Sequence, residues 1–105
     1  MTLIAQCASL TEVRQHIDRL DRQLVTLIAE RGAYVKQAAG FKNTAAEVPA
    51  PQRFAEVMAR VNALACEIGA EPAVVDATWR AMIAAFIDME RAAQGNLHPP
   101  SPQPN

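Results

Sequence analysis

A long amphipathic helix is the feature that most constrains what this chain can fold into. Mostly apolar residues recur at alternating steps of three and four, a spacing that places them on one helical face over about four heptads. We call this row of residues the seam. These positions are Leu10, Val13, Ile17, Leu20, Leu24, Leu27, Arg31, Tyr34 and Ala38. Ser9 suits the N-cap, Glu12 completes a capping-box pattern, and Gly40 is placed to end the helix. The pattern therefore predicts a helix of roughly 30 residues between Ser9 and Gly40, about 45 Å long.

A helix of that length extends beyond the diameter of a small globule. The chain has 105 residues, of which 50% are hydrophobic and 20% charged, as expected for one modest globular domain. Two shorter helices from the same chain cannot cover the whole seam, and a chain of this size buries little surface alone. We therefore expect a partner chain along the long helix.

Two shorter amphipathic helices follow the first. Pro51 fits the first position of a helix that ends near Gly69, and Pro72 opens a third helix that reaches Gln94. Their apolar stripes are Phe54, Val57, Val61, Leu64 and Ile68, and then Val75, Trp79, Met82, Phe86 and either Met89 or Glu90. Neither strand-like alternation nor a hairpin-turn dipeptide competes with this pattern. The sequence predicts an all-α domain over 1–95 and a disordered, proline-rich tail over 96–105.

Composition excludes several classes of function. The formal net charge of −1 gives no reason to expect a nucleic acid or an anionic membrane as partner. The apolar runs are too short to span a bilayer, and MTLIAQCASL lacks the basic start of a signal peptide. Cys7 and Cys66 form no CxxC pair, and His16 and His98 lack ligand-like neighbours. We expect a reduced, cytoplasmic protein that uses no metal and no cofactor.

Two arginines on the long helix are candidate functional residues. Arg31 occupies a seam position, where a guanidinium needs an anion because it cannot shed its charge. A nearby carboxylate or a path to the surface would satisfy Arg31, and so would the carboxylate of a ligand. Arg14 lies on the flank of the seam, where pairing with Asp18 is the simpler interpretation. The arginines are about 25 Å apart along one helix, so both could bind one small anion only if one came from an antiparallel partner chain.

Three further charged residues lie outside the long helix. The segment GFKNTAAEVPAPQR, 40–53, interrupts the helical pattern and carries Lys42 with no carboxylate at helical spacing before Glu47. Glu90 shares a face with apolar residues, so it either lies at a frayed helix end or is held against a cation. Arg53, near Glu56, is by itself typical of an exposed charge.

In combination these residues resemble the all-helical AroQ class of chorismate mutases, in particular the branch that contains isochorismate pyruvate lyase, the salicylate-forming enzyme. The resemblance covers about residues 8–94. It rests on Ile17, Asp18 and Asp21, on Arg31 ten residues later, and on the FK…PAPxR segment. It implies an intertwined homodimer of three-helix chains whose long first helices pair antiparallel. Each of its two active sites would be built from both chains.

The resemblance implies that the arginines bind a small dianion, chorismate or isochorismate. Arg14 would come from the partner chain and Arg31 from the chain of the site itself, and each would bind a substrate carboxylate. Arg53 would assist in binding a carboxylate.

The resemblance also implies the residues that face the reacting bond. Lys42 would contact a carboxylate and the ether oxygen of the enolpyruvyl group, and would have the substrate as partner in place of a protein group. Glu90 would face the same oxygen, and Phe86 would form a wall of the pocket. Glu90 can donate a hydrogen bond only when protonated, so we expect activity to fall as the pH rises and Glu90→Gln to flatten the profile.

Two departures from the family pattern point in opposite directions. Typical bacterial mutases carry acidic residues around the second-helix arginine, whereas this chain has Ala50 and Phe54, like the lyase branch. The lyase branch carries glutamine at the position of Glu90, where some mutases carry glutamate. We expect a chorismate mutase first and an isochorismate pyruvate lyase second. A non-catalytic helical dimer is a third interpretation, which the charge at Arg31 disfavours.

Overall fold

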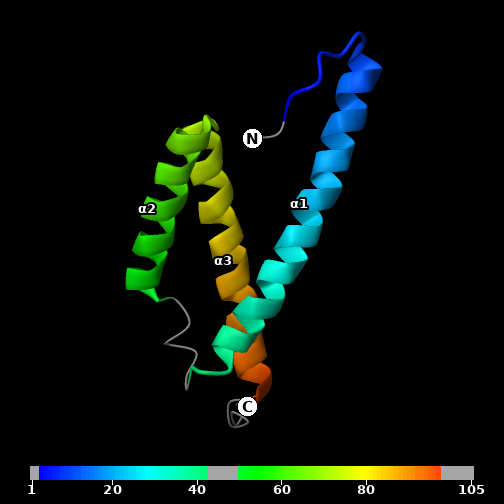
Figure 1. Ribbon diagram of the computed structural model, residues 1–105. Coiled ribbons are helices and arrows are strands. Elements are labelled where there is room, and N and C mark those ends of the chain that lie inside the picture. The colour runs from blue at the N-terminus through cyan, green and yellow to red at the C-terminus, as the bar shows by residue number, and fades with distance from the viewer. Residues whose placement is uncertain (1–2, 43–49, 98–105) are drawn as a thin grey trace, which may run out of the picture. The chain divides into compact units, whose positions relative to one another are not determined.

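Three helices make up the described part of the chain in the computed structural model, which comprises residues 3–42 and 50–97 (Figure 1). They are α1, Leu10–Ala39, α2, Pro51–Ile68, and α3, Pro72–Leu97. Neither described range contains a strand. The all-α prediction is confirmed, and the pairing with a second chain stays a prediction.

The start of α1 follows its capping signal with one change. The Oγ atom of Ser9 accepts a hydrogen bond from the backbone N–H of Glu12, with a donor–acceptor distance of 3.2 Å. The Glu12 carboxylate in turn accepts from the backbone N–H of Ala8 at 2.9 Å, one residue earlier than in a standard capping box. Both bonds satisfy amides that have no partner within the helix.

The other end of α1 lies where Gly40 predicts it. The backbone N–H groups of Gly40, Phe41 and Lys42 each donate to the carbonyl three residues earlier, at 3.1 Å. The helix therefore tightens into a last turn of 3₁₀ type and does not end in a left-handed residue. This turn leads directly to Lys42.

The connection between α2 and α3 is set by glycine and proline. Gly69 has φ 76°, the left-handed conformation that glycine adopts without strain, and the N–H of Ala70 donates to the Ala65 carbonyl at 2.8 Å. Pro72 then occupies the first position of α3. Both boundaries agree with the sequence prediction.

The far end of α3 differs from the prediction. The helix continues to Leu97 and not only to Gln94, so the expected tail of 96–105 begins within its last turn. A proline disfavours helix at the residue before it, and the sequence contains no proline between Pro72 and Leu97 that would end α3 earlier. Residues 98–105, where most of the expected tail falls, lie outside the described residues.

The chain divides into two compact units, one that ends at Tyr34 and one that begins at Val35. In the second unit, α2 (green) and α3 (yellow to orange) pack side by side and antiparallel (Figure 1). The buried residues of α2 are Val57, Met58, Val61 and Ala65. Leu64 and Ile68, which belong to the predicted apolar stripe, are exposed, because the packing turns the core face toward Met58 and Ala65. As far as the structure describes them, none of the three helices has an apolar stretch that could span a bilayer.

Candidate active site

Lys42 and Glu90 form an ion pair within the second unit. The Nζ atom of Lys42 donates a hydrogen bond to Oε2 of Glu90 at 2.7 Å, a short, charge-assisted contact. The side chains are 22% and 7% exposed. The prediction that Lys42 lacks a protein partner is therefore wrong. Of the two interpretations of Glu90, the structure favours the one in which a cation holds it.

The backbone positions this pair from two elements. Lys42 follows the last, tightened turn of α1, where its own N–H donates to the Ala39 carbonyl at 3.1 Å. Glu90 lies on the buried side of α3 and is 6% exposed as a residue. The ion pair therefore ties the end of α1 to α3, and removal of either partner would leave a poorly hydrated charge.

The pair offers a cation that a protein carboxylate holds in place. Glu90 fixes the ammonium at 2.7 Å in a part-buried setting, where electrostatic interactions are stronger than in bulk water. Such a group can bind an anion or stabilise a developing negative charge.

Phe86 and Arg53 also belong to the second unit. Phe86 is half-buried and precedes Glu90 by one turn of α3, which makes the two side chains neighbours on one helical face. Arg53 lies in the first turn of α2, and its Nη1 atom is 3.8 Å from Oε2 of Glu56. The side chains of Arg53 and Glu56 are each more than half exposed, so their contact contributes little to stability and leaves the Arg53 guanidinium accessible.

Arg14 and Arg31 lie on α1 within the first unit. Arg14 is exposed. The helical spacing allowed an ion pair between Arg14 and Asp18, but the ion pairs found among the described residues do not include it. Arg31 is half-buried. Their predicted contribution to the site, and that of Arg53 and Phe86, stays a prediction.

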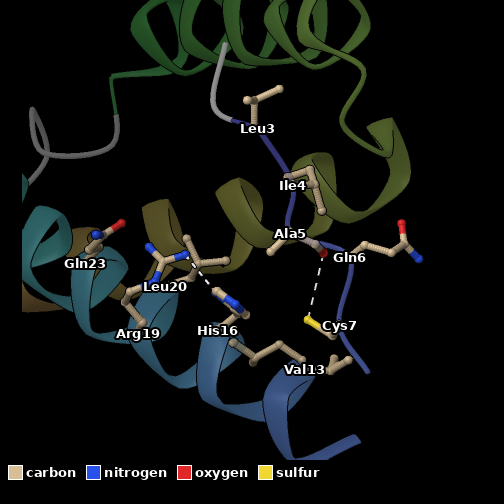
Figure 2. A pocket seen from close by; sticks show the side chains of 11 residues that line it. Leu3, Ile4, Ala5, Gln6, Cys7, Val13, His16, Arg19, Leu20 and Gln23 are labelled. Carbon is tan, nitrogen blue, oxygen red and sulfur yellow. Dashed lines mark hydrogen bonds between the residues drawn. The ribbon is translucent and has the colours of Figure 1, made fainter. Parts of the chain in front are cut away.

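A hollow of about 610 Å³ in the first unit is not the candidate site. Figure 2 shows it between the segment from Leu3 to Cys7 and one face of α1. Most of its lining is apolar, and its one charged residue, Arg19, has Nη2 at 3.3 Å from Nδ1 of His16. None of the predicted site residues lines it. A small dianion needs several cations, which this hollow lacks.

A polar network for which the sequence pattern gave no prediction joins α2 to α3. Nε of Arg80 donates to Oδ2 of Asp76 at 2.7 Å, and Nδ2 of Asn62 donates to Oδ1 of Asp76 at 3.1 Å. The hydrogen bond from Arg80, followed by that from Asn62, lowers the pKa of the Asp76 carboxyl below its ordinary 3.8. The spacing of Asp76 and Arg80 signals a helical pair, but the link to α2 depends on packing.

No three histidine, cysteine or acidic side chains among the described residues lie close enough together to hold a metal ion.

The family profile described as chorismate mutase type II matches residues 13–91. The isochorismate pyruvate lyase of Pseudomonas aeruginosa is 33% identical over 81 residues, which cover 77% of this chain and 80% of that protein. The family match begins one residue before Arg14 and ends one residue after Glu90.

Proposed function

This chain belongs to the chorismate mutase type II family, and we propose that it converts chorismate to prephenate at a site that contains Lys42 and Glu90. The observation that carries the proposal is the ion pair of 2.7 Å, which supplies a fixed, part-buried cation within the matched range. A scaffold that only forms a helical dimer would gain little from a charged pair in this position, because apolar residues of similar size pack at no desolvation cost.

The reaction suits a site without a nucleophile. Conversion of chorismate to prephenate is an intramolecular Claisen rearrangement, in which the bond to the ether oxygen breaks as a new carbon–carbon bond forms. The enzyme must hold a flexible dianion in its compact, reactive conformer, which is catalysis by positioning. Negative charge grows on the ether oxygen in the transition state, so fixed donors aimed at that oxygen lower the barrier.

Lys42 is the donor that we assign to the ether oxygen. Its ammonium, which Glu90 holds in place, supplies a positive charge that can stabilise the negative charge on that oxygen. Glu90 holds the ammonium in place when ionised, and becomes a second donor to the same oxygen when protonated. Phe86, one turn away on α3, would exclude water from the reacting bond.

The substrate carboxylates require further cations, for which we propose Arg14, Arg31 and Arg53. Because Arg14 and Arg31 are about 25 Å apart on one helix, we assign Arg31 to the chain of the site and Arg14 to the partner subunit. Nine large apolar residues of α1 support such a homodimer, since their exposed fractions range from 39% to 65% in the single chain. They are Leu10, Val13, Ile17, Leu20, Leu24, Val25, Leu27, Ile28 and Tyr34.

A second candidate activity is elimination of pyruvate from isochorismate to leave salicylate. The relative at 33% identity carries the name of that activity, and the PAPQR stretch of this chain is similar to the lyase branch. The elimination also breaks the bond to the enolpyruvyl ether oxygen, so the same donors would serve it. Glu90, where that branch has glutamine, favours the mutase.

The test is incubation of the purified chain with each substrate separately. We expect prephenate from chorismate as the main product, and measurement of salicylate plus pyruvate from isochorismate reports the second activity. Arg31→Ala should abolish either activity while helicity and the size of the assembly are unchanged, with the exposed Arg22→Ala as control. A folded wild-type chain that converts neither substrate would overturn the proposal and favour the non-catalytic dimer.

A further inference from the structure

The first turn of α2, which carries Arg53, has no side-chain cap of its own. Its N-cap residue is Ala50, which makes no side-chain hydrogen bond to the helix, and Pro51 occupies the first position. No acidic residue in this turn complements the helix dipole. The contact between Arg53 and Glu56 spans 3.8 Å between two exposed side chains. Local interactions therefore do little to fix the turn, and its position depends on α3.

Arg80 of α3 supplies the contact that the turn lacks. Its guanidinium carbon lies over the ring of Phe54, 5.6 Å from the centroid, which is within the range of a cation–π interaction. Phe54 directly follows Arg53 in the chain. The ring and the guanidinium therefore join the first turn of α2 to the middle of α3.

Arg80 is itself held in this orientation. Its Nε atom donates to Asp76 at 2.7 Å, and the other oxygen of Asp76 accepts from Asn62 at 3.1 Å. Nδ2 of Asn62 also donates to the Met58 carbonyl at 2.8 Å. The network thus includes Phe54, Met58 and Asn62 of α2, each about one turn from the next along the helix.

We propose that Arg80 is a positioning residue for Arg53: Asp76 fixes Arg80, Arg80 fixes the ring of Phe54, and the first turn of α2 then holds the Arg53 guanidinium where a substrate carboxylate binds. This inference rests on the proposed function, in which Arg53 assists in binding that carboxylate. A purely structural role for Arg80 would lower stability without affecting substrate affinity through Arg53.

The test is a double-mutant cycle between Arg53→Gln and Arg80→Met, with the proposed substrate and steady-state kinetics. Arg80→Met alone should raise KM roughly three- to fivefold with little change in kcat, as expected for loss of one exposed cation–π contact. In the Arg53→Gln background the same change should alter KM by less than about twofold. Arg60→Met, which removes an exposed arginine elsewhere on α2, should leave KM unchanged.

Asp76→Ala provides the same cycle by a second route, should Arg80→Met fail to fold. This variant keeps Arg80 but removes the carboxylate that accepts its hydrogen bond at 2.7 Å. It should raise KM as Arg80→Met does, and should have little effect on KM in the Arg53→Gln background. An unchanged KM in the single variants, or an equal rise with and without Arg53, would overturn the inference alone. A wild-type chain inactive on both substrates would overturn the proposed function and this inference together.

Discussion

Lys42 and Glu90 meet at 2.7 Å although 48 positions separate them in the chain. Glu90 is nearly inaccessible to water and Lys42 is mostly shielded, so the two charges depend on each other. Their contact joins the end of α1 to α3 and fixes an ammonium inside the part of the chain that matches the family profile. The pair therefore affects both stability and the reaction, and variants of its two residues can separate these effects.

Lys42→Met should greatly reduce activity and destabilise the fold. Loss of one donor to a developing oxyanion lowers kcat by roughly 100- to 1,000-fold. The free energy of unfolding should fall by about 2 kcal/mol, less than the roughly 3–5 kcal/mol measured for fully buried pairs, because Lys42 is partly exposed and Glu90 can take up a proton. Steady-state kinetics and urea unfolding measure the two effects.

The double variant Lys42→Met with Glu90→Leu separates these effects. Replacement of both charges by apolar groups removes the unpaired carboxylate, so stability should return close to that of the wild type while activity stays lost. Recovery of activity in the double variant would exclude Lys42 as the donor in the reaction.

Glu90→Gln should change how activity depends on pH. A protonated Glu90 carboxyl can donate a hydrogen bond to the ether oxygen, whereas an ionised one repels the negative charge that develops there. The kcat of the wild type should therefore fall with rising pH. A glutamine amide donates at every pH, so the profile of the variant should be flat. Glu67→Gln, on the exposed face of α2, is the control, and parallel profiles for wild type and Glu90→Gln would remove Glu90 from the mechanism.

Asp76 should contribute to stability against acid. Hydrogen bonds from Arg80 and Asn62 lower the pKa of its carboxyl in the folded state below the ordinary 3.8. The ionised form is thus favoured by folding, so its stabilising effect is present above about pH 3.8 and is lost as the pH falls through the lowered pKa. The melting temperature of Asp76→Asn should decline less steeply in acid than that of the wild type. The exposed Asp88→Asn on α3 should follow the wild-type curve.

Local signals predicted the helices because helix ends depend on nearby residues. Ser9 caps α1 through a bond to Glu12, and Gly69 ends α2 through its positive φ, each within a few positions of the boundary. The exposure of Leu64 and Ile68 was not predictable in this way, because the relative rotation of α2 and α3 decides which side of an amphipathic stripe is buried.

The candidate site was predictable as a set of residues but not as a set of contacts. The spacing of Glu90 within an apolar stripe marked it as unusual, and the structure shows that it is buried. Its pairing with Lys42 joins two elements that are distant in sequence, and helical spacing rules address only residues three or four apart. For the same reason the contact of Arg80 with Phe54 had no sequence signal.

The shared site of the proposed homodimer predicts complementation between two inactive variants. Arg14→Ala and Arg31→Ala should each lack activity when pure, because each removes one carboxylate ligand from both sites. In a mixed dimer, one site combines the intact Arg31 of one chain with the intact Arg14 of the partner subunit, and the other site has neither.

Mixing the variants in equal amounts under conditions that exchange subunits should restore about a quarter of wild-type specific activity, since about half of the dimers are mixed and each has one intact site. Light scattering before and after mixing should give the mass of a dimer throughout. Arg14→Ala mixed with itself after the same exchange step is the control and should stay inactive. A dimer that exchanges subunits but regains no activity would show that Arg14 and Arg31 do not complete one site from two chains.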